Sequence, residues 1–69
     1  MDWKFIIRDF SQKKAGKILL NSHEIFSDRK DVIYEANQTA KKYNFSNYMI
    51  CIYCKAADSE DTWGLFSII

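Results

Sequence analysis

Two cysteines and one histidine are the residues of this chain best suited to catalysis or metal binding. The segment Cys51-Ile52-Tyr53-Cys54 has the C-x-x-C spacing of redox and zinc sites. A redox pair needs its first thiol at a helix N-terminus, whereas these cysteines lie inside an apolar run of strand character. Residues three apart on a strand point to opposite faces, so the two sulfurs are not expected to form a disulfide. We therefore expect reduced, apolar thiols and keep a metal or thiol enzyme as the least favoured class.

The other polar residues offer no further catalytic arrangement. His23 stands alone, because its chain neighbours would face the other side of a strand and a zinc site would need two more ligands. The carboxylates gather at Asp28 and Asp31, where a helix begins, and in an acidic turn at residues 58–61, where capping and solubility account for them. Glycine-rich phosphate loops and nucleophile elbows are absent. The sequence predicts a non-enzymatic protein with no catalytic, cofactor-binding or metal-binding residue.

Length and composition limit the class of protein. A chain of 69 residues has room for one domain, expected to span residues 1–69, and its net charge of +1 excludes a general polycation. Aromatic residues make up 16% of the chain, more than a small domain easily buries, and exposed aromatic patches indicate a partner. No apolar run approaches the roughly 20 residues that span a bilayer. Charged residues interrupt the N-terminal apolar stretch, which does not fit the pattern of a signal peptide. We expect a cytoplasmic protein that does not bind membranes.

The order of hydrophobic periods predicts the fold. Two alternating runs come first, at Trp3–Phe10 and Lys17–Phe26, followed by a helical stretch at Asp28–Tyr43 and two strand-like runs at Tyr48–Ala56 and Thr62–Ile69. This order, ββαββ, predicts an α+β domain: a single antiparallel four-stranded sheet with one helix packed on it. The third run is almost continuously apolar, which is expected of a central strand.

Local signals predict how the helix and the first hairpin are built. Ser27 or Asp28 can cap the helix, and Asn44 can end it in the left-handed conformation. Gly16 lies in the polar loop between the first two strands and, as a glycine, is free to take a positive φ there. Helical spacing predicts packing of the helix on the sheet through Ile33, Ala36, Ala40 and Tyr43.

Basic residues form the candidate binding surface. Three lysines fall within five positions of one hairpin loop, and further cations lie in the first turn of the predicted helix. Surface charges usually serve only solubility, but this density would also complement an acidic or phosphate-bearing partner. The predicted partner-binding residues are Lys13, Lys14, Lys17, Arg29 and Lys30. If they do not carry binding, the aromatic residues of the sheet are the next candidates, Trp3 and Tyr53 first.

The plan of the whole chain resembles that of a known family. The chain opens on an aliphatic strand, Phe5-Ile6-Ile7-Arg8-Asp9, continues with a lysine-bearing hairpin and an alanine-containing helix (Glu35-Ala36…Ala40-Lys41), and closes with two strands. In this it is similar to small phage-encoded anti-CRISPR proteins that inhibit type I surveillance complexes. The resemblance implies a stoichiometric inhibitor, monomeric or weakly dimeric, that docks on a large protein or ribonucleoprotein complex in the cytoplasm of a bacterial host. It assigns no site residue.

The alternative is a small nucleic-acid-binding or regulatory module, similar to an antitoxin. Aromatic and basic residues interleave in the first strand, as in Trp3-Lys4-Phe5, and could form a stacking platform for single strands. The ribonucleoprotein signature of RNA-binding sheets is absent. Tight binding to a purified protein complex would favour the inhibitor, whereas steeply salt-dependent binding to free nucleic acid would favour the alternative.

Overall fold

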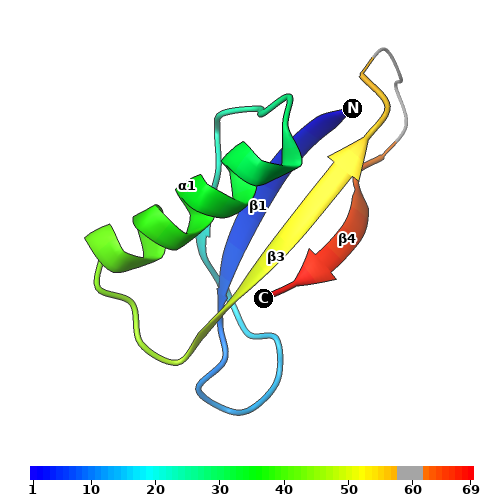
Figure 1. Cartoon of the computed structure of the whole chain (residues 1–69). Helices are drawn as coiled ribbons and strands as arrows, with labels where there is room; N and C mark the ends of the chain where they lie inside the picture. The colour runs from blue at the N-terminus through cyan, green and yellow to red at the C-terminus, as the bar shows by residue number, and fades with distance from the viewer. Residues whose placement is uncertain (58–61) are drawn as a thin grey trace.

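The computed structural model describes residues 1–57 and 62–69, and shows four strands and one helix in the predicted order ββαββ (Figure 1). The elements are β1 (Asp2–Asp9), β2 (Ile18–Asn21), α1 (Arg29–Lys42), β3 (Tyr48–Lys55) and β4 (Gly64–Ile68). The strands form one antiparallel sheet in the order β2-β1-β3-β4, which confirms the α+β fold and the central position of β3. The acidic turn expected at residues 58–61 lies outside the described residues.

The core lies between α1 and one face of the sheet. Its buried members are Trp3, Phe5, Ile7, Val32, Ala36, Ala40, Ile50 and Ile52. Strand side chains alternate between faces, so the odd-numbered residues of β1 and the even-numbered residues of β3 point toward the helix. Ala36 and Ala40 present only methyl groups, which lets α1 approach the two central strands closely.

Both ends of α1 are capped as the sequence predicts. The Asp28 carboxylate accepts a hydrogen bond from the backbone N–H of Lys30 at 2.9 Å, so Asp28 is the N-cap. At the other end Asn44 has a φ of 56°, and the N–H groups of Asn44 and Phe45 bond back to carbonyls of the last turn at 3.1 and 3.2 Å. This is the Schellman arrangement, and it satisfies carbonyls that would otherwise lack partners.

The prediction that Tyr43 packs on the sheet is wrong. Its side chain is 55% exposed, and its ring stacks on Phe45 with centroids 5.7 Å apart. Tyr43 is the C-cap, at an end of the helix that faces β2, whereas α1 packs on β1 and β3. The buried helix face therefore consists of Val32, Ala36 and Ala40, with Ile33 half-buried beside them.

Gly16 does not use its freedom to take a positive φ, and the left-handed residue of this loop is Lys13, with a φ of 58°. Gly16 serves a different need. A Cβ atom at this position would lie 3.0 Å from the Asp9 carbonyl oxygen, to which the Gly16 N–H donates at 2.8 Å. The glycine therefore allows the close approach of the two chain segments that start the hairpin.

The second strand is shorter than its hydrophobic run. After Asn21 the chain leaves the sheet and returns only at Phe26, which exchanges backbone hydrogen bonds of 2.8 and 2.9 Å with Trp3. At the point of departure the Ser22 hydroxyl accepts from the Phe5 N–H at 3.1 Å, in place of a ladder carbonyl. The polar residues Ser22, His23 and Glu24 in the middle of that run thus lie outside β2.

Candidate protein-binding site

The face of the sheet turned away from α1 carries a broad apolar surface. In the register of β1 and β3, Ile6 lies opposite Cys51 and Arg8 lies opposite Met49. Residues of β2 and β4 extend the same face outward. We call this surface the open face, and it consists of Lys4, Ile6, Arg8, Ile18, Met49, Cys51, Tyr53, Lys55, Trp63, Leu65 and Ile68.

The open face has a buried centre and an exposed aliphatic border. Ile6 and Cys51 are only 8% and 3% exposed, although α1, the helix of the described residues, covers the other face (Figure 1). Around them Ile18, Leu65 and Ile68 are 47%, 55% and 54% exposed. Apolar patches of this kind on a small domain mark sites where another macromolecule excludes water.

Cations border this apolar surface. The ammonium groups of Lys4 and Lys55 lie 5.5 and 5.4 Å from the ring centroid of Trp63, which is the geometry of cation–π interactions. Arg8 donates from its guanidinium to the Gly16 carbonyl at 3.0 Å, which ties the open face to the hairpin loop. Among the described residues, these three cations share this side of the sheet with one carboxylate, that of Asp2, which lies opposite Lys55. This balance makes the described part of the face complementary to a surface rich in carboxylates.

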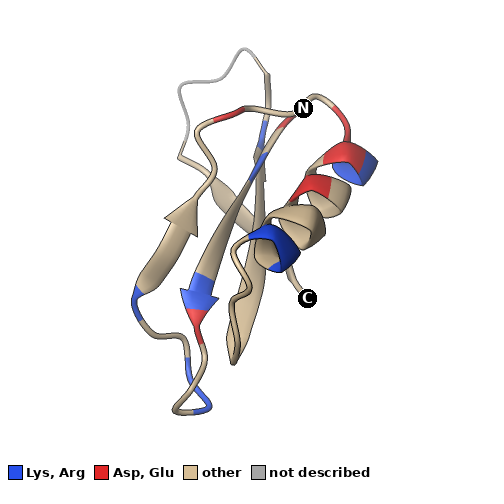
Figure 2. Ribbon diagram, turned by 90° about the vertical axis from the view of Figure 1, so that its left-hand side faces the viewer, with Lys and Arg blue, Asp and Glu red and all other residues tan. Residues whose placement is uncertain are grey.

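The structure divides the predicted basic residues into two groups (Figure 2). Lys13, Lys14 and Lys17 are exposed in the loop that follows β1, next to Arg8 and the open face. Arg29 and Lys30 are exposed on the first turn of α1, after the Phe26–Trp3 bridge at the start of β1. A strand of eight residues, such as β1, spans roughly 24 Å, so the two groups lie at opposite ends of the sheet.

Of the two aromatic residues proposed as a second choice, Trp3 is not available to a partner. It is 8% exposed and lies beneath α1, where its ring meets Phe66 edge to face with centroids 5.0 Å apart. Because Trp3 and Phe5 both point toward the helix, they cannot form the stacking platform that the first strand suggested. Tyr53 is half-buried on the open face, so it stays a candidate contact residue.

The sequence interpretation missed the contribution of β4. It expected the apolar C-terminal run to be paired, and β4 is indeed paired with β3, but as the outer strand of the sheet. As a result three apolar side chains of β4 and that of the following residue are about half exposed: Leu65, Phe66, Ile68 and Ile69. The signal was present in residues 62–69, which contain no charged side chain.

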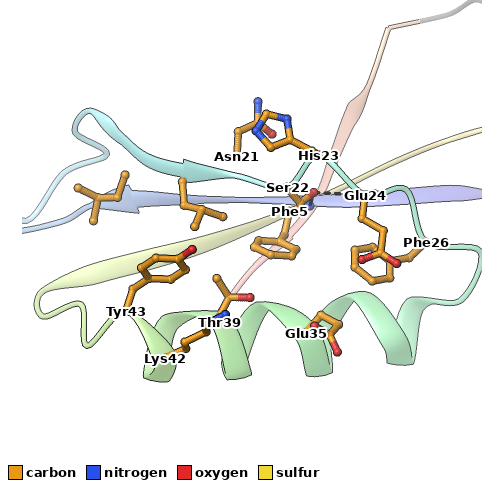
Figure 3. A pocket seen from close by; sticks show the side chains of 12 residues that line it. Phe5, Asn21, Ser22, His23, Glu24, Phe26, Glu35, Thr39, Lys42 and Tyr43 are labelled. Atoms are coloured by element: carbon orange, nitrogen blue, oxygen red, sulfur yellow. Dashed lines mark hydrogen bonds between the residues drawn. The ribbon is translucent and has the colours of Figure 1, made fainter.

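A groove of about 620 Å³ has α1 on one side, and β2 and the segment that follows β2 on the other (Figure 3). It forms because α1 packs on β1 and β3 and leaves β2 uncovered. The floor is apolar, with Phe5 and Phe26, while His23, Glu24 and Lys42 stand on the rim. His23 is exposed there, in a loop and not in a strand as its sequence context suggested. Within residues 1–57 and 62–69, no three His, Cys, Asp or Glu side chains could together hold a metal ion.

The two cysteines are free thiols on opposite faces of β3, as predicted. Cys51 is buried on the open face, and Cys54 is half-buried against the core beneath α1. Burial raises the pKa of the Cys51 thiol above its ordinary value of 9.0, and the Arg8 guanidinium partly opposes this by favouring the thiolate. A thiol held protonated in this way is a poor nucleophile at neutral pH.

The raised pKa of Cys51 predicts a pH dependence of stability. Because the folded protein holds the proton more tightly than the unfolded chain, this contribution is fully present below the unfolded value of 9.0 and is lost as the pH rises through the folded pKa. Urea denaturation at increasing alkaline pH should show the loss in the parent and in Cys54→Ala. In Cys51→Ala this part of the pH dependence should be gone, and an unchanged profile in that variant would contradict the assignment.

The chain matches no protein-family model, and no curated protein or solved structure is significantly similar to it. No helix of the described residues is long and apolar enough to cross a membrane. The resemblance to anti-CRISPR proteins therefore rests on the order and character of the elements.

Proposed function

We propose that this chain is a non-enzymatic protein-binding domain that uses its open face to bind an acidic, partly apolar surface of a larger protein. The observation that carries this proposal is the combination of a buried aliphatic centre, an exposed aliphatic border and three cations on one side of the sheet. Burial of the border against a partner supplies the favourable free energy, while the cations speed encounter and set orientation.

A photo-cross-linking pair tests the surface directly. A photoreactive residue at Ile18, 47% exposed on the open face, should form adducts with a host protein. The matched control is Tyr34, 62% exposed on α1, where the same residue should form none. Adducts at Tyr34 but not at Ile18 would show that the binding surface lies on the helix and not on the open face.

Within this class we propose the specific role that the overall plan suggests, a stoichiometric inhibitor of a type I surveillance complex. The test is target-DNA binding by such a purified complex, titrated with this chain. Inhibition should be complete near one equivalent of chain per binding site and should be lost when Lys4 and Lys55 are both replaced by glutamate. If the wild-type chain neither binds nor inhibits the complex, the specific role is wrong, while the cross-linking experiment still decides the general one.

One observation favours single-stranded nucleic acid as a second candidate partner. Tyr53 and Trp63 lie on the open face beside Lys4 and Lys55, and rings next to cations are what base-stacking platforms use. The aliphatic centre of the face offers no hydrogen bonds to bases, so we place protein first. Fluorescence of the two tryptophans, titrated with oligonucleotides at several salt concentrations, separates the candidates: quenching with a steep salt dependence would support nucleic acid.

The hairpin lysines give a further prediction. Replacing Lys13, Lys14 and Lys17 with glutamate should leave the thermal melt unchanged, because all three are exposed, and should abolish inhibition of the surveillance complex. The matched control is the pair Arg29→Glu and Lys30→Glu, at the far end of the sheet, for which the structure leads us to expect a much smaller loss. Full activity of the triple variant would show that the hairpin is not part of the binding surface.

A further inference from the structure

The outer strand β4 lacks the usual protection of an exposed sheet edge. Natural edge strands carry lysine, proline or inward charges that stop a further strand from pairing with them. Residues 62–69 contain no charged side chain and no proline, and the only such device in β4 is an irregularity in its register with β3. Leu65, Phe66, Ile68 and Ile69 are all 47–55% exposed, so apolar side chains flank this edge on both faces.

The backbone of Ile68 is free to pair with another strand. Ile69 exchanges both backbone hydrogen bonds with Ile50, at 3.1 and 2.9 Å, so its N–H and C=O groups point toward β3. In an antiparallel sheet the next residue along the strand directs its groups the other way. The N–H and C=O of Ile68 therefore point outward, where a neighbouring strand could accept and donate.

The distribution of charge indicates which chain could supply this neighbouring strand. An interface between two identical copies brings the same residues together, so a charged surface repels itself. The open face has three cations, and the hairpin has three lysines beside β2. Among the surfaces that the structure describes, the β4 edge combines exposed apolar side chains and outward backbone groups with no charged side chain of its own. The nearest cation is the Arg29 guanidinium, which lies over the Phe66 ring at 5.7 Å on the α1 side of the sheet. A second copy can therefore pair with β4 with less like-charge repulsion than through the open face or through β2.

We propose that two copies of this chain associate through antiparallel pairing of their β4 strands into one continuous sheet. The two-fold axis then passes through the middle of the β4 pair, perpendicular to the sheet. Both open faces lie on one side of this sheet and both α1 helices lie on the other. Dimerisation thus doubles the open face without covering it, and it does not depend on the identity of the partner.

The first test measures mass, with no partner present. Sedimentation velocity of the wild-type chain should show a concentration-dependent shift from monomer to dimer. Ile68→Lys places two cations across the β4 pair and should leave a monomer at every concentration. The control is Ile18→Lys on β2, the opposite edge strand, because the Ile18 side chain is 47% exposed and that of Ile68 is 54% exposed. The Ile18→Lys variant should dimerise like the wild type. Loss of dimer only in the Ile18 variant would overturn the proposal.

The second test needs no substitution, so it holds even if Ile68→Lys fails to fold. Amide hydrogen exchange of the wild-type chain should slow at Ile68 as concentration rises, because its outward N–H becomes hydrogen-bonded across the dimer. The control amide is Asn21, which also points outward, since its neighbour Ser22 donates to Phe5 of β1 at 2.9 Å. A monomer at all concentrations, or equal slowing at both amides, would contradict pairing through β4.

Discussion

Replacing Ile7 with alanine should lower the free energy of unfolding by about 2–5 kcal/mol, the range for large-to-small substitutions in a tightly packed core. Ile7 is completely buried in the middle of β1, between the two strands that flank it and beneath α1. The neighbouring backbone is hydrogen-bonded on both sides, so the sheet cannot collapse to fill the cavity. In a domain of this size such a loss is a large part of the total stability, and many molecules should unfold.

Chemical denaturation monitored by tryptophan fluorescence would measure this loss. The matched control is Ile18→Ala, at a residue of β2 that is 47% exposed, for which we expect a change within about 0.5 kcal/mol. The two variants remove the same atoms, so the difference between them isolates the effect of burial. Equal destabilisation by both substitutions would mean that the core is not where the structure places it.

The second large effect is expected at the helix–sheet contact. Ala36→Gln adds a polar side chain at a residue that is completely buried against the sheet. Overpacking costs about 1–3 kcal/mol, and a buried amide without partners costs about 1–3 kcal/mol more. We therefore expect the variant to melt far below the parent, or to lose the cooperative transition altogether.

A thermal scan by circular dichroism would show this change. Lys41→Gln is the control, because Lys41 is exposed on the same helix and glutamine has a helix propensity similar to that of lysine. It should melt within a few degrees of the parent. If Ala36→Gln melted like the parent, the helix would contact the sheet through another face.

Much of the fold followed from local signals in the sequence. The order of hydrophobic periods predicted ββαββ, and the helix begins at Asp28 and ends near Asn44 as their side-chain chemistry requires. The opposite orientation of Cys51 and Cys54 also followed, because it depends only on the two-residue repeat of a strand. These features depend on interactions between residues that are close in the chain.

The candidate site could be predicted only in part. The hairpin lysines were visible as a cluster, but their link to the open face depends on Arg8, whose side chain reaches the Gly16 carbonyl across the hairpin. Arg29 and Lys30 looked like members of the same surface, because the sequence does not show at which end of the sheet the helix begins. The sequence pattern also did not determine which face of the sheet α1 covers, so it did not show that Trp3 lies beneath α1 and not on the surface.

The sequence by itself determined the identity, order and capping of the elements and the two faces of each strand, because these depend on short-range periodicity and local hydrogen bonding. Only the tertiary structure decided the strand order β2-β1-β3-β4, the face that α1 covers and the exposed position of β4. Those outcomes depend on contacts between residues far apart in the chain, whose relative free energies no local pattern contains. The open face and the β4 edge, which carry both proposals, are products of that long-range choice.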